Sequence, residues 1–269
     1  MLSKIMKIIC LVKYVPNVED IKYDYEENVL IRDNVKLILN PDDAAAVAFA
    51  LKAKELEPEH QIEVVTMGPK SVKPFVEDLL RRPVDRAAVI SDSAFAGSDT
   101  YATSKILASY LKDKEYDCIL TGSKSLDGDT SHIPSQLGEI LNLNQMSDIM
   151  SIDQDSFSKE EAVFEVESGD KSLTYRIKLP AILSLRKESG YELPYIKYEN
   201  MSLDVSDSLK FISNEDLKLD KESIGLKGSL TKVADTYNKN FDQKDKTVVK
   251  NDDQGIDYVY SFLKKKGFV

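Results

Sequence analysis

Short apolar runs alternate with expected helices through the first 143 residues, and this alternation constrains the fold most. The run from Met6 to Val12 is apolar except at Lys7, which is typical of a strand covered on both faces of a sheet. Further runs at 62–67, 87–90 and 118–120 are each followed by an expected helix. Four such strand–helix units predict an α/β fold with a mostly parallel, doubly covered sheet.

Polar residues mark where the expected helices begin. In the segment 40–43, which reads Asn-Pro-Asp-Asp, the asparagine can cap a helix and the proline loses no needed donor. The two aspartates there face the positive end of the helix dipole. We expect Ser98 to cap a second helix, and Thr130 or Ser131 to cap a third over 133–143.

The pattern changes after the fourth unit. Residues 162–166 and 172–178 alternate in the manner of antiparallel strands, with turn-like residues at 168–170 between them. Residues 181–185 are another apolar strand candidate. We therefore expect an antiparallel addition to the parallel sheet.

The last third of the chain has a different character. From 187 onward it is charged and shows little periodicity, over a stretch too long for an ordinary loop. We expect an α/β domain over 1–186 and an extended arm over 187–269 that folds on a partner. An amphipathic helix over 253–265 would end this arm.

Composition excludes several classes of function. The 36 Lys and Arg against 46 Asp and Glu give a formal net charge of −10, which argues against nucleic acid as a main partner. Two cysteines and two widely separated histidines argue against a metal site. Cys10 and Cys118 lie in apolar runs and are expected to be buried structural thiols. Since no apolar run approaches the roughly 20 residues of a membrane-spanning helix, and none resembles a signal peptide, we expect a cytoplasmic location.

Unusual residues follow three of the expected strands, at 11–13, 67–69 and 121–131. In open parallel sheets, ligands bind beyond the carboxyl ends of the strands. Gly122 and Gly128 permit tight turns and close backbone approach, and free N–H groups at the next helix start favour an anion such as phosphate. The sequence therefore indicates a nucleotide site at this edge, although Asp-Gly-Asp-Thr before a helix is often only a helix start.

Few side chains near this site offer chemistry of their own. Lys13 is a cation there, with a solvated surface lysine as the alternative. His132 could donate to a ligand, or it could serve as a cap or lie on the surface. The chain has no Gly-x-Gly-x-x-Gly fingerprint, no Walker loop and no nucleophile with a base and an orienting group. We therefore nominate no catalytic residue, and any chemistry must come from a bound cofactor.

Several motifs share an order and spacing that point to one family. They are 39–43, 67–69, 96–104, 122–130, 193–194 and 225–229. With these motifs the chain resembles the beta subunit of electron transfer flavoproteins over nearly its whole length. The resemblance implies a sheet of the adenine-nucleotide-binding type, and a heterodimer with an alpha subunit that carries an electron-transferring FAD.

The resemblance also implies which residues of this chain hold a nucleotide. They are Leu11, Asn40, Pro41, Asp42, Asp43, Met67, Gly122, Ser123, Lys124, Ser125, Leu126, Asp127, Gly128, Asp129, Thr130, Ser131, His132 and Ile133. Within this set we expect the backbone of 122–133 to hold the pyrophosphate of the nucleotide, and we expect residues 40–43 to contact the adenosine end of the same nucleotide.

The family has two versions of this site. In one version, AMP occupies the site as a structural ligand. In the other, a second FAD accepts hydride from NADH and splits the electron pair between the alpha-subunit flavin and a low-potential acceptor such as ferredoxin or flavodoxin. The run at 127–130, with Gly128 where AMP-binding subunits carry bulkier acidic residues, resembles the FAD-binding, bifurcating type.

The resemblance extends to a partner enzyme. Leu193 matches the anchor of a loop that docks acyl-CoA dehydrogenases, although 195–199 lacks the family's usual lysine run. His132 stands where the bifurcating pattern usually has Gln. A non-catalytic adenine-nucleotide sensor with the same sheet is the alternative from another class, and such a sensor needs no long arm.

Overall fold

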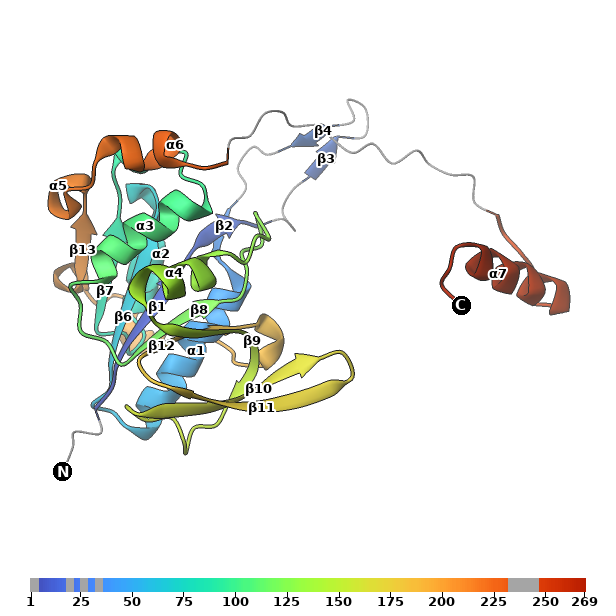
Figure 1. Cartoon of the computed structure of the whole chain (residues 1–269), viewed down its shortest axis with the longest axis horizontal. Coiled ribbons are helices and arrows are strands. Elements are labelled where there is room, and N and C mark those ends of the chain that lie inside the picture. Colours follow the sequence, from blue (N-terminus) through green and yellow to red (C-terminus); the bar gives the residue numbers. More distant parts are fainter. Residues whose placement is uncertain (1–4, 18–21, 25–28, 32–35, 232–246) are drawn as a thin grey trace. The chain divides into compact units, whose positions relative to one another are not determined.

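One mixed sheet organises the described part of the chain, which in this computed structural model comprises residues 5–17, 22–24, 29–31, 36–231 and 247–269 (Figure 1). Its strand order is β11-β10-β9-β12-β8-β1-β6-β7-β13. The strands are β1 (Lys7–Val12), β6 (Gln61–Met67), β7 (Arg86–Ile90), β8 (Cys118–Gly122), β9 (Asn144–Ile152), β10 (Glu161–Ser168), β11 (Lys171–Lys178), β12 (Ala181–Leu185) and β13 (Leu209–Ile212).

The pairing directions confirm the expected sheet. Along that order, every neighbouring pair from β9 to β13 is parallel. The hairpin of β10 and β11 is antiparallel and continues the sheet beyond β9. Two short antiparallel ladders join β2 (Tyr14–Pro16) to β5 (Leu37–Leu39) and β3 (Lys22–Asp24) to β4 (Val29–Ile31).

The described helices are α1 (Pro41–Leu56), α2 (Lys73–Leu80), α3 (Thr100–Leu111), α4 (Ile133–Leu141), α5 (Asn214–Leu217), α6 (Gly225–Gly228) and α7 (Asp253–Lys265). Helices α1 to α4 alternate with parallel strands, and α5 to α7 follow β13. Short 3₁₀ turns occupy Lys70–Val72, Ser93–Phe95, Lys187–Ser189, Tyr198–Asn200, Ser206–Ser208 and Lys221–Ser223.

The side chains of β1 show that both faces of the sheet are covered. Ile8, Cys10 and Val12 enter a core that includes buried residues of α1 and α2. Ile9 and Leu11 enter a second core that includes buried residues of α3 and α4. Because successive side chains of a strand point to opposite faces, a continuous apolar run fits this double burial.

The start of α3 differs from the expectation. Asp99, not Ser98, caps the helix, since an Asp99 carboxylate oxygen accepts a hydrogen bond from the Ala102 N–H at 2.9 Å. The Ser98 hydroxyl donates instead to the Phe95 carbonyl at 2.8 Å. The expected cap at Ser98 was wrong because the carboxylate one residue later reaches the orphan N–H of the first turn.

The chain divides into two compact units, 1–233 and 234–269. In the first unit, the segment after 187 supplies β13 and the buried Ile224. In the second unit, α7 has the bounds that the sequence predicted. The role of 187–269 as an arm that embraces a partner stays a prediction.

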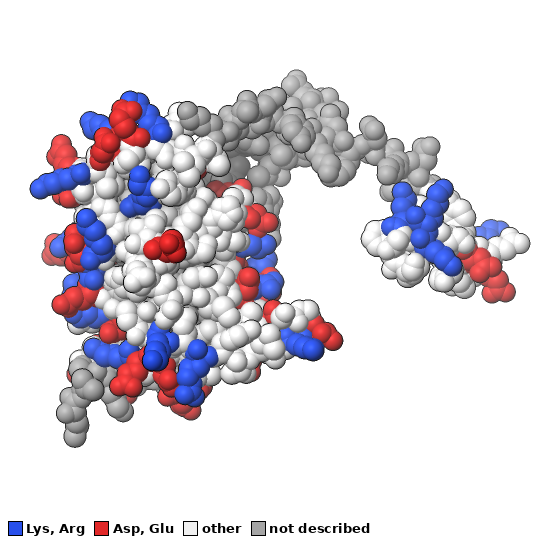
Figure 2. Space-filling model, in the orientation of Figure 1, with Lys and Arg blue, Asp and Glu red and all other residues white. Residues whose placement is uncertain are grey.

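Other features of the described residues bear on function. No helix within these ranges has the length and hydrophobicity needed to cross a bilayer. The same ranges contain no group of three or more His, Cys, Asp or Glu side chains placed to hold a metal ion. Cys10 and Cys118 are buried free thiols, as predicted. On the face of the first unit drawn in Figure 2, basic and acidic side chains are interspersed.

Candidate functional site

A cavity of about 580 Å³ lies at the carboxyl ends of β1, β6 and β8. Its wall includes the ends of these strands, residues of the loop 123–131, and the first turns of α3 and α4. This volume is typical of small-molecule sites, and the position is where open parallel sheets bind ligands. The cavity therefore lies where the sequence indicated a ligand site.

Many of the residues implied by the family resemblance line this cavity. They are Leu11, Asp43, Met67, Gly122, Ser123, Lys124, Ser125, Gly128, Thr130, Ser131, His132 and Ile133. The residues of that set outside the cavity wall are Asn40, Pro41, Asp42, Leu126, Asp127 and Asp129.

The start of α3 is a part of the wall that the sequence did not reveal. Asp99, Thr100 and Thr103 line the cavity, together with Thr231. An Asp99 carboxylate oxygen accepts from the Thr231 N–H at 2.8 Å and from its hydroxyl at 3.0 Å. The signal that could have identified this wall is the position of 96–104 after β7, at the same edge of the sheet.

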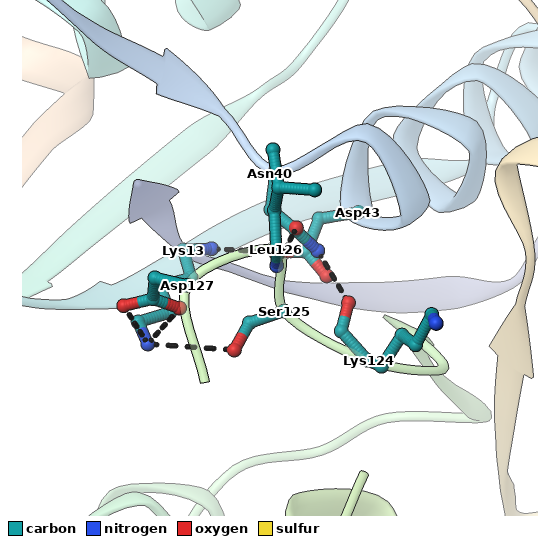
Figure 3. A network of polar contacts seen from close by, with 7 residues as sticks. All are labelled: Lys13, Asn40, Asp43, Lys124, Ser125, Leu126 and Asp127. Atoms are coloured by element: carbon teal, nitrogen blue, oxygen red, sulfur yellow. Dashed lines mark hydrogen bonds and ion pairs between the residues drawn. The ribbon is translucent and has the colours of Figure 1, made fainter. Parts of the chain in front are cut away.

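Asn40 holds the loop that follows β8 (Figure 3). Its side-chain amide donates to the Lys124 carbonyl at 2.8 Å, and its side-chain oxygen accepts from the Leu126 N–H at 3.0 Å. Asn40 occupies the N-cap position of α1 but makes no capping hydrogen bond with its side chain. The expected cap was wrong, because both ends of this amide are engaged by a loop distant in sequence.

The two aspartates that follow also bind backbone N–H groups. Asp43 accepts from Gly122 at 2.9 Å through one oxygen and from Lys13 at 2.7 Å through the other. Asp42 accepts from Lys124 at 3.2 Å and from Lys187 at 3.0 Å. The start of α1 therefore holds the ends of β1, β8 and β12 together.

Burial dominates the ionisation of these aspartates. It raises the pKa of Asp43 to about 7, against the hydrogen bonds from Lys13, Asn40 and Gly122, which favour the carboxylate. Burial also raises the pKa of Asp42 above its usual value. A charged ligand near Asp43 would therefore meet a group whose protonation changes close to neutral pH.

The backbone before α4 is unusual. Asp129 and Ser131 have φ values of 49° and 53°, in the left-handed region that non-glycine residues rarely adopt. Gly128 lies outside that region, and a Cβ there would meet only the Ser125 hydroxyl oxygen, at 3.6 Å. Gly128 lies in a turn, as the sequence allowed, but neither its φ nor a close approach requires glycine there, and the left-handed residues at 129 and 131 shape the loop.

The N-terminus of α4 faces this cavity without a side-chain cap. His132, at the N-cap position, makes no capping hydrogen bond, so the expected cap by Thr130 or Ser131 was wrong. The His132 ring nitrogen Nδ1 lies 3.5 Å from the Thr100 hydroxyl oxygen at the start of α3. Helix N-termini carry free N–H groups and partial positive charge, which suit a phosphate.

Apolar side chains complete the wall. Leu11, Val65, Met67 and Phe95 line the cavity from the strand ends and the turn before α3. Such a surface suits a planar ring, while the loop and the helix start suit a phosphate. The arrangement is chemically equipped to bind a nucleotide-like ligand.

Leu193 lies apart from this cavity. It is half-buried and packs against the core on the α1 side of the sheet. Arg82 donates through Nε to the Pro194 carbonyl at 2.6 Å, which fixes the neighbouring backbone. Tyr195 and Tyr198 are 95% and 90% exposed, so the apolar surface at this segment belongs mainly to these two residues.

Comparison with known proteins points to one family. The model of the electron transfer flavoprotein domain matches residues 27–192. The protein named electron transfer flavoprotein subunit beta in Clostridium acetobutylicum is 30% identical over 98% of this chain and 100% of its own length. The protein of the same name in Thermoanaerobacterium thermosaccharolyticum is 31% identical over 87% of this chain and 89% of its own length. The caffeyl-CoA reductase-Etf complex subunit CarD of Acetobacterium woodii is 31% identical over 86% of this chain and 87% of its own length.

Proposed function

The chain belongs to the electron transfer flavoprotein family as a beta subunit, and from this premise we propose that its cavity binds FAD in the manner of the bifurcating type. Members of this family take part in electron transfer. A bound FAD would supply the redox chemistry, accepting hydride from NADH and passing electrons to an alpha-subunit flavin and to an acceptor such as ferredoxin or flavodoxin.

The uncapped N-terminus of α4 at the cavity is the observation that carries this proposal. Its free N–H groups would hold a pyrophosphate, since no side chain of the N-cap residue His132 occupies them. The loop 122–127 is held by the start of α1, so its backbone is positioned before any ligand binds. Such preorganisation lowers the entropic cost of binding.

Gly128 favours FAD over AMP in this proposal. It lines the cavity and has room beside it, because a Cβ would meet only the Ser125 hydroxyl oxygen. A larger acidic residue at this position would reduce the cavity and place a negative charge on its wall. The absence of a side chain at 128 therefore leaves space for the larger nucleotide.

We also propose two protein partners. One is an alpha subunit, because beta subunits of this family act as part of a heterodimer. The other is an acyl-CoA dehydrogenase-type enzyme, docked at the segment around Leu193, where Tyr195 and Tyr198 expose apolar surface. The name of the Acetobacterium relative, which is a subunit of a caffeyl-CoA reductase-Etf complex, supports a partner that acts on a CoA thioester.

The test is to purify the chain together with its alpha subunit and to identify the nucleotides released on denaturation. Two FAD per heterodimer, with rapid reduction of flavin by NADH in stopped-flow absorbance, are the expected results. One FAD with one AMP would overturn the bifurcating function and leave the AMP-binding version. A flavin-free homodimer that ignores the alpha subunit would favour a nucleotide sensor instead.

A further inference from the structure

Both lysines that line the cavity are already paired with carboxylates. Among the described residues of the cavity wall, Lys13 and Lys124 carry the permanent positive charges. Lys13 Nζ lies 2.7 Å from each carboxylate oxygen of Asp127, and Lys124 Nζ lies 2.9 Å from Asp129. Lysines in a phosphate site ordinarily serve as point charges for the ligand. Here the carboxylates of Asp127 and Asp129 neutralise the charges of both lysines.

The pair of Lys13 and Asp127 is the better protected of the two (Figure 3). The Asp127 side chain is 34% exposed, whereas that of Asp129 is 69% exposed. Burial alone would raise the pKa of Asp127, but the hydrogen bonds from Lys13 and Ser125 hold it below its usual value. Because partly buried charges are screened less by salt, this pair has the larger effect on the cavity.

The loop does not depend on this ion pair for its position. Asn40 holds the backbone at 124 and 126, and Asp43 holds it at 122. A half-exposed ion pair adds little to such a hydrogen-bonded framework. The main consequence of the pair is therefore electrostatic, because it cancels the charge of a lysine on the cavity wall.

We propose that Asp127 sets the affinity of the cavity for phosphate-bearing ligands by neutralising Lys13. This inference rests on the proposed nucleotide site. With Lys13 compensated, the phosphate is held by N–H groups of α4 and the loop, and the ring-binding apolar surface decides which nucleotide binds. Asp127 thereby lowers the affinity for simple anions, so that selection depends on the ring more than on charge.

The experiment measures the binding of AMP and of adenosine to the full chain by calorimetry, after charcoal has removed bound nucleotide. In about 50 mM NaCl, Asp127→Asn is expected to bind AMP about three- to tenfold more tightly than the wild type, as freeing one partly exposed charge implies. Adenosine affinity is expected to stay the same. The gain for AMP is expected to shrink in about 1 M NaCl, where the screening length is short.

Two further variants separate charge from structure. Combining Asp127→Asn with Lys13→Met is expected to abolish the gain, because no lysine is then released. Glu115→Gln is the matched control: Glu115 pairs with Lys7 at the opposite end of β1, outside the cavity wall, and its loss is expected to leave AMP binding unchanged.

The outcomes distinguish this inference from the proposed function. If Asp127→Asn weakens AMP and adenosine equally, or leaves AMP binding as in the wild type, the charge-setting role is wrong while the nucleotide site stands. If the wild-type chain binds neither AMP nor adenosine, this inference is overturned; if the same calorimetry also shows no binding of FAD, the nucleotide site is overturned with it.

Discussion

Gly122 donates its backbone N–H to a carboxylate oxygen of Asp43 at 2.9 Å, across 79 positions of sequence. A Cβ built on Gly122 would lie 2.3 Å from that same oxygen and 2.7 Å from the Asp42 Cβ. Glycine is therefore required at 122 by the close approach of α1 to the end of β8, and not by a left-handed backbone.

Gly122→Ala is expected to destabilise the protein by about 1–3 kcal/mol, because the added methyl group forces α1 and the loop apart. Gly128→Ala is the matched control, since a Cβ there has room, and its effect should stay within about 0.5 kcal/mol. Chemical denaturation of both variants measures the difference. Equal losses at the two positions would contradict the role given to the Asp43 contact.

Asp43 should make stability depend on pH. Since burial raises its pKa from 3.8 to about 7, the folded state binds the proton more tightly than the unfolded chain between these values. The free energy of unfolding therefore falls by at most about 4 kcal/mol as the pH rises from about 4 to about 7. Above about pH 7, Asp43 is ionised in both states and causes no further change in stability.

Asp43→Asn tests this contribution. The amide loses one acceptor for a backbone N–H, which should cost about 1–3 kcal/mol at every pH. The pH dependence that Asp43 gives to the free energy of unfolding should disappear in the variant. The difference in stability between wild type and variant should therefore shrink as the pH rises from 5 to 8. Urea denaturation across this range measures it, with the exposed Asp129→Asn as the control. A deficit that stays constant with pH would contradict the raised pKa.

Asn40→Ala should loosen the loop after β8 and weaken nucleotide binding. The variant leaves the Lys124 carbonyl and the Leu126 N–H without their partner, at a cost of about 1–3 kcal/mol. Hydrogen exchange of residues 124–127 should speed up, and AMP affinity should fall.

A matched control for this variant exists elsewhere in the chain. Asn214 makes the same double contact with the backbone of Leu219, at 3.0 and 3.1 Å, and neither residue lines the cavity. Asn214→Ala should cost comparable stability without changing AMP affinity. A similar loss of AMP binding in both variants would show that the effect on the ligand comes from general destabilisation.

Gly128→Glu should change the nucleotide held by the heterodimer with the alpha subunit. The backbone at 128 accepts a side chain, so the variant is expected to fold, but the larger side chain would occupy part of the cavity and leave room only for the smaller nucleotide. FAD content should fall by one per heterodimer, with AMP in its place, as measured by chromatography of the released nucleotides. Gly128→Ala should retain the wild-type content; unchanged FAD in Gly128→Glu would contradict the assignment.

The elements that could be predicted are those with a strong local pattern. The continuous apolar run of β1 and the amphipathic pattern of α7 both depend on side chains close together in sequence. β9 was not predicted, because only Ile149 and Ile152 of its residues are buried and the rest are partly or fully exposed. β13 is a four-residue edge strand that parallel pairing with β7 defines.

The sequence alone predicted the alternation of strands and helices, the edge of the sheet where the cavity lies, and the family motifs of the loop 122–130. The contacts that the polar side chains make there depend on the tertiary fold. Asn40 and Asp43 bind the backbone of a loop about 80 positions away, which no local pattern indicated, and their contact with the adenosine end of a ligand stays a prediction. Local patterns report burial and helix starts, whereas a hydrogen bond depends on which distant backbone groups the folded sheet brings within reach.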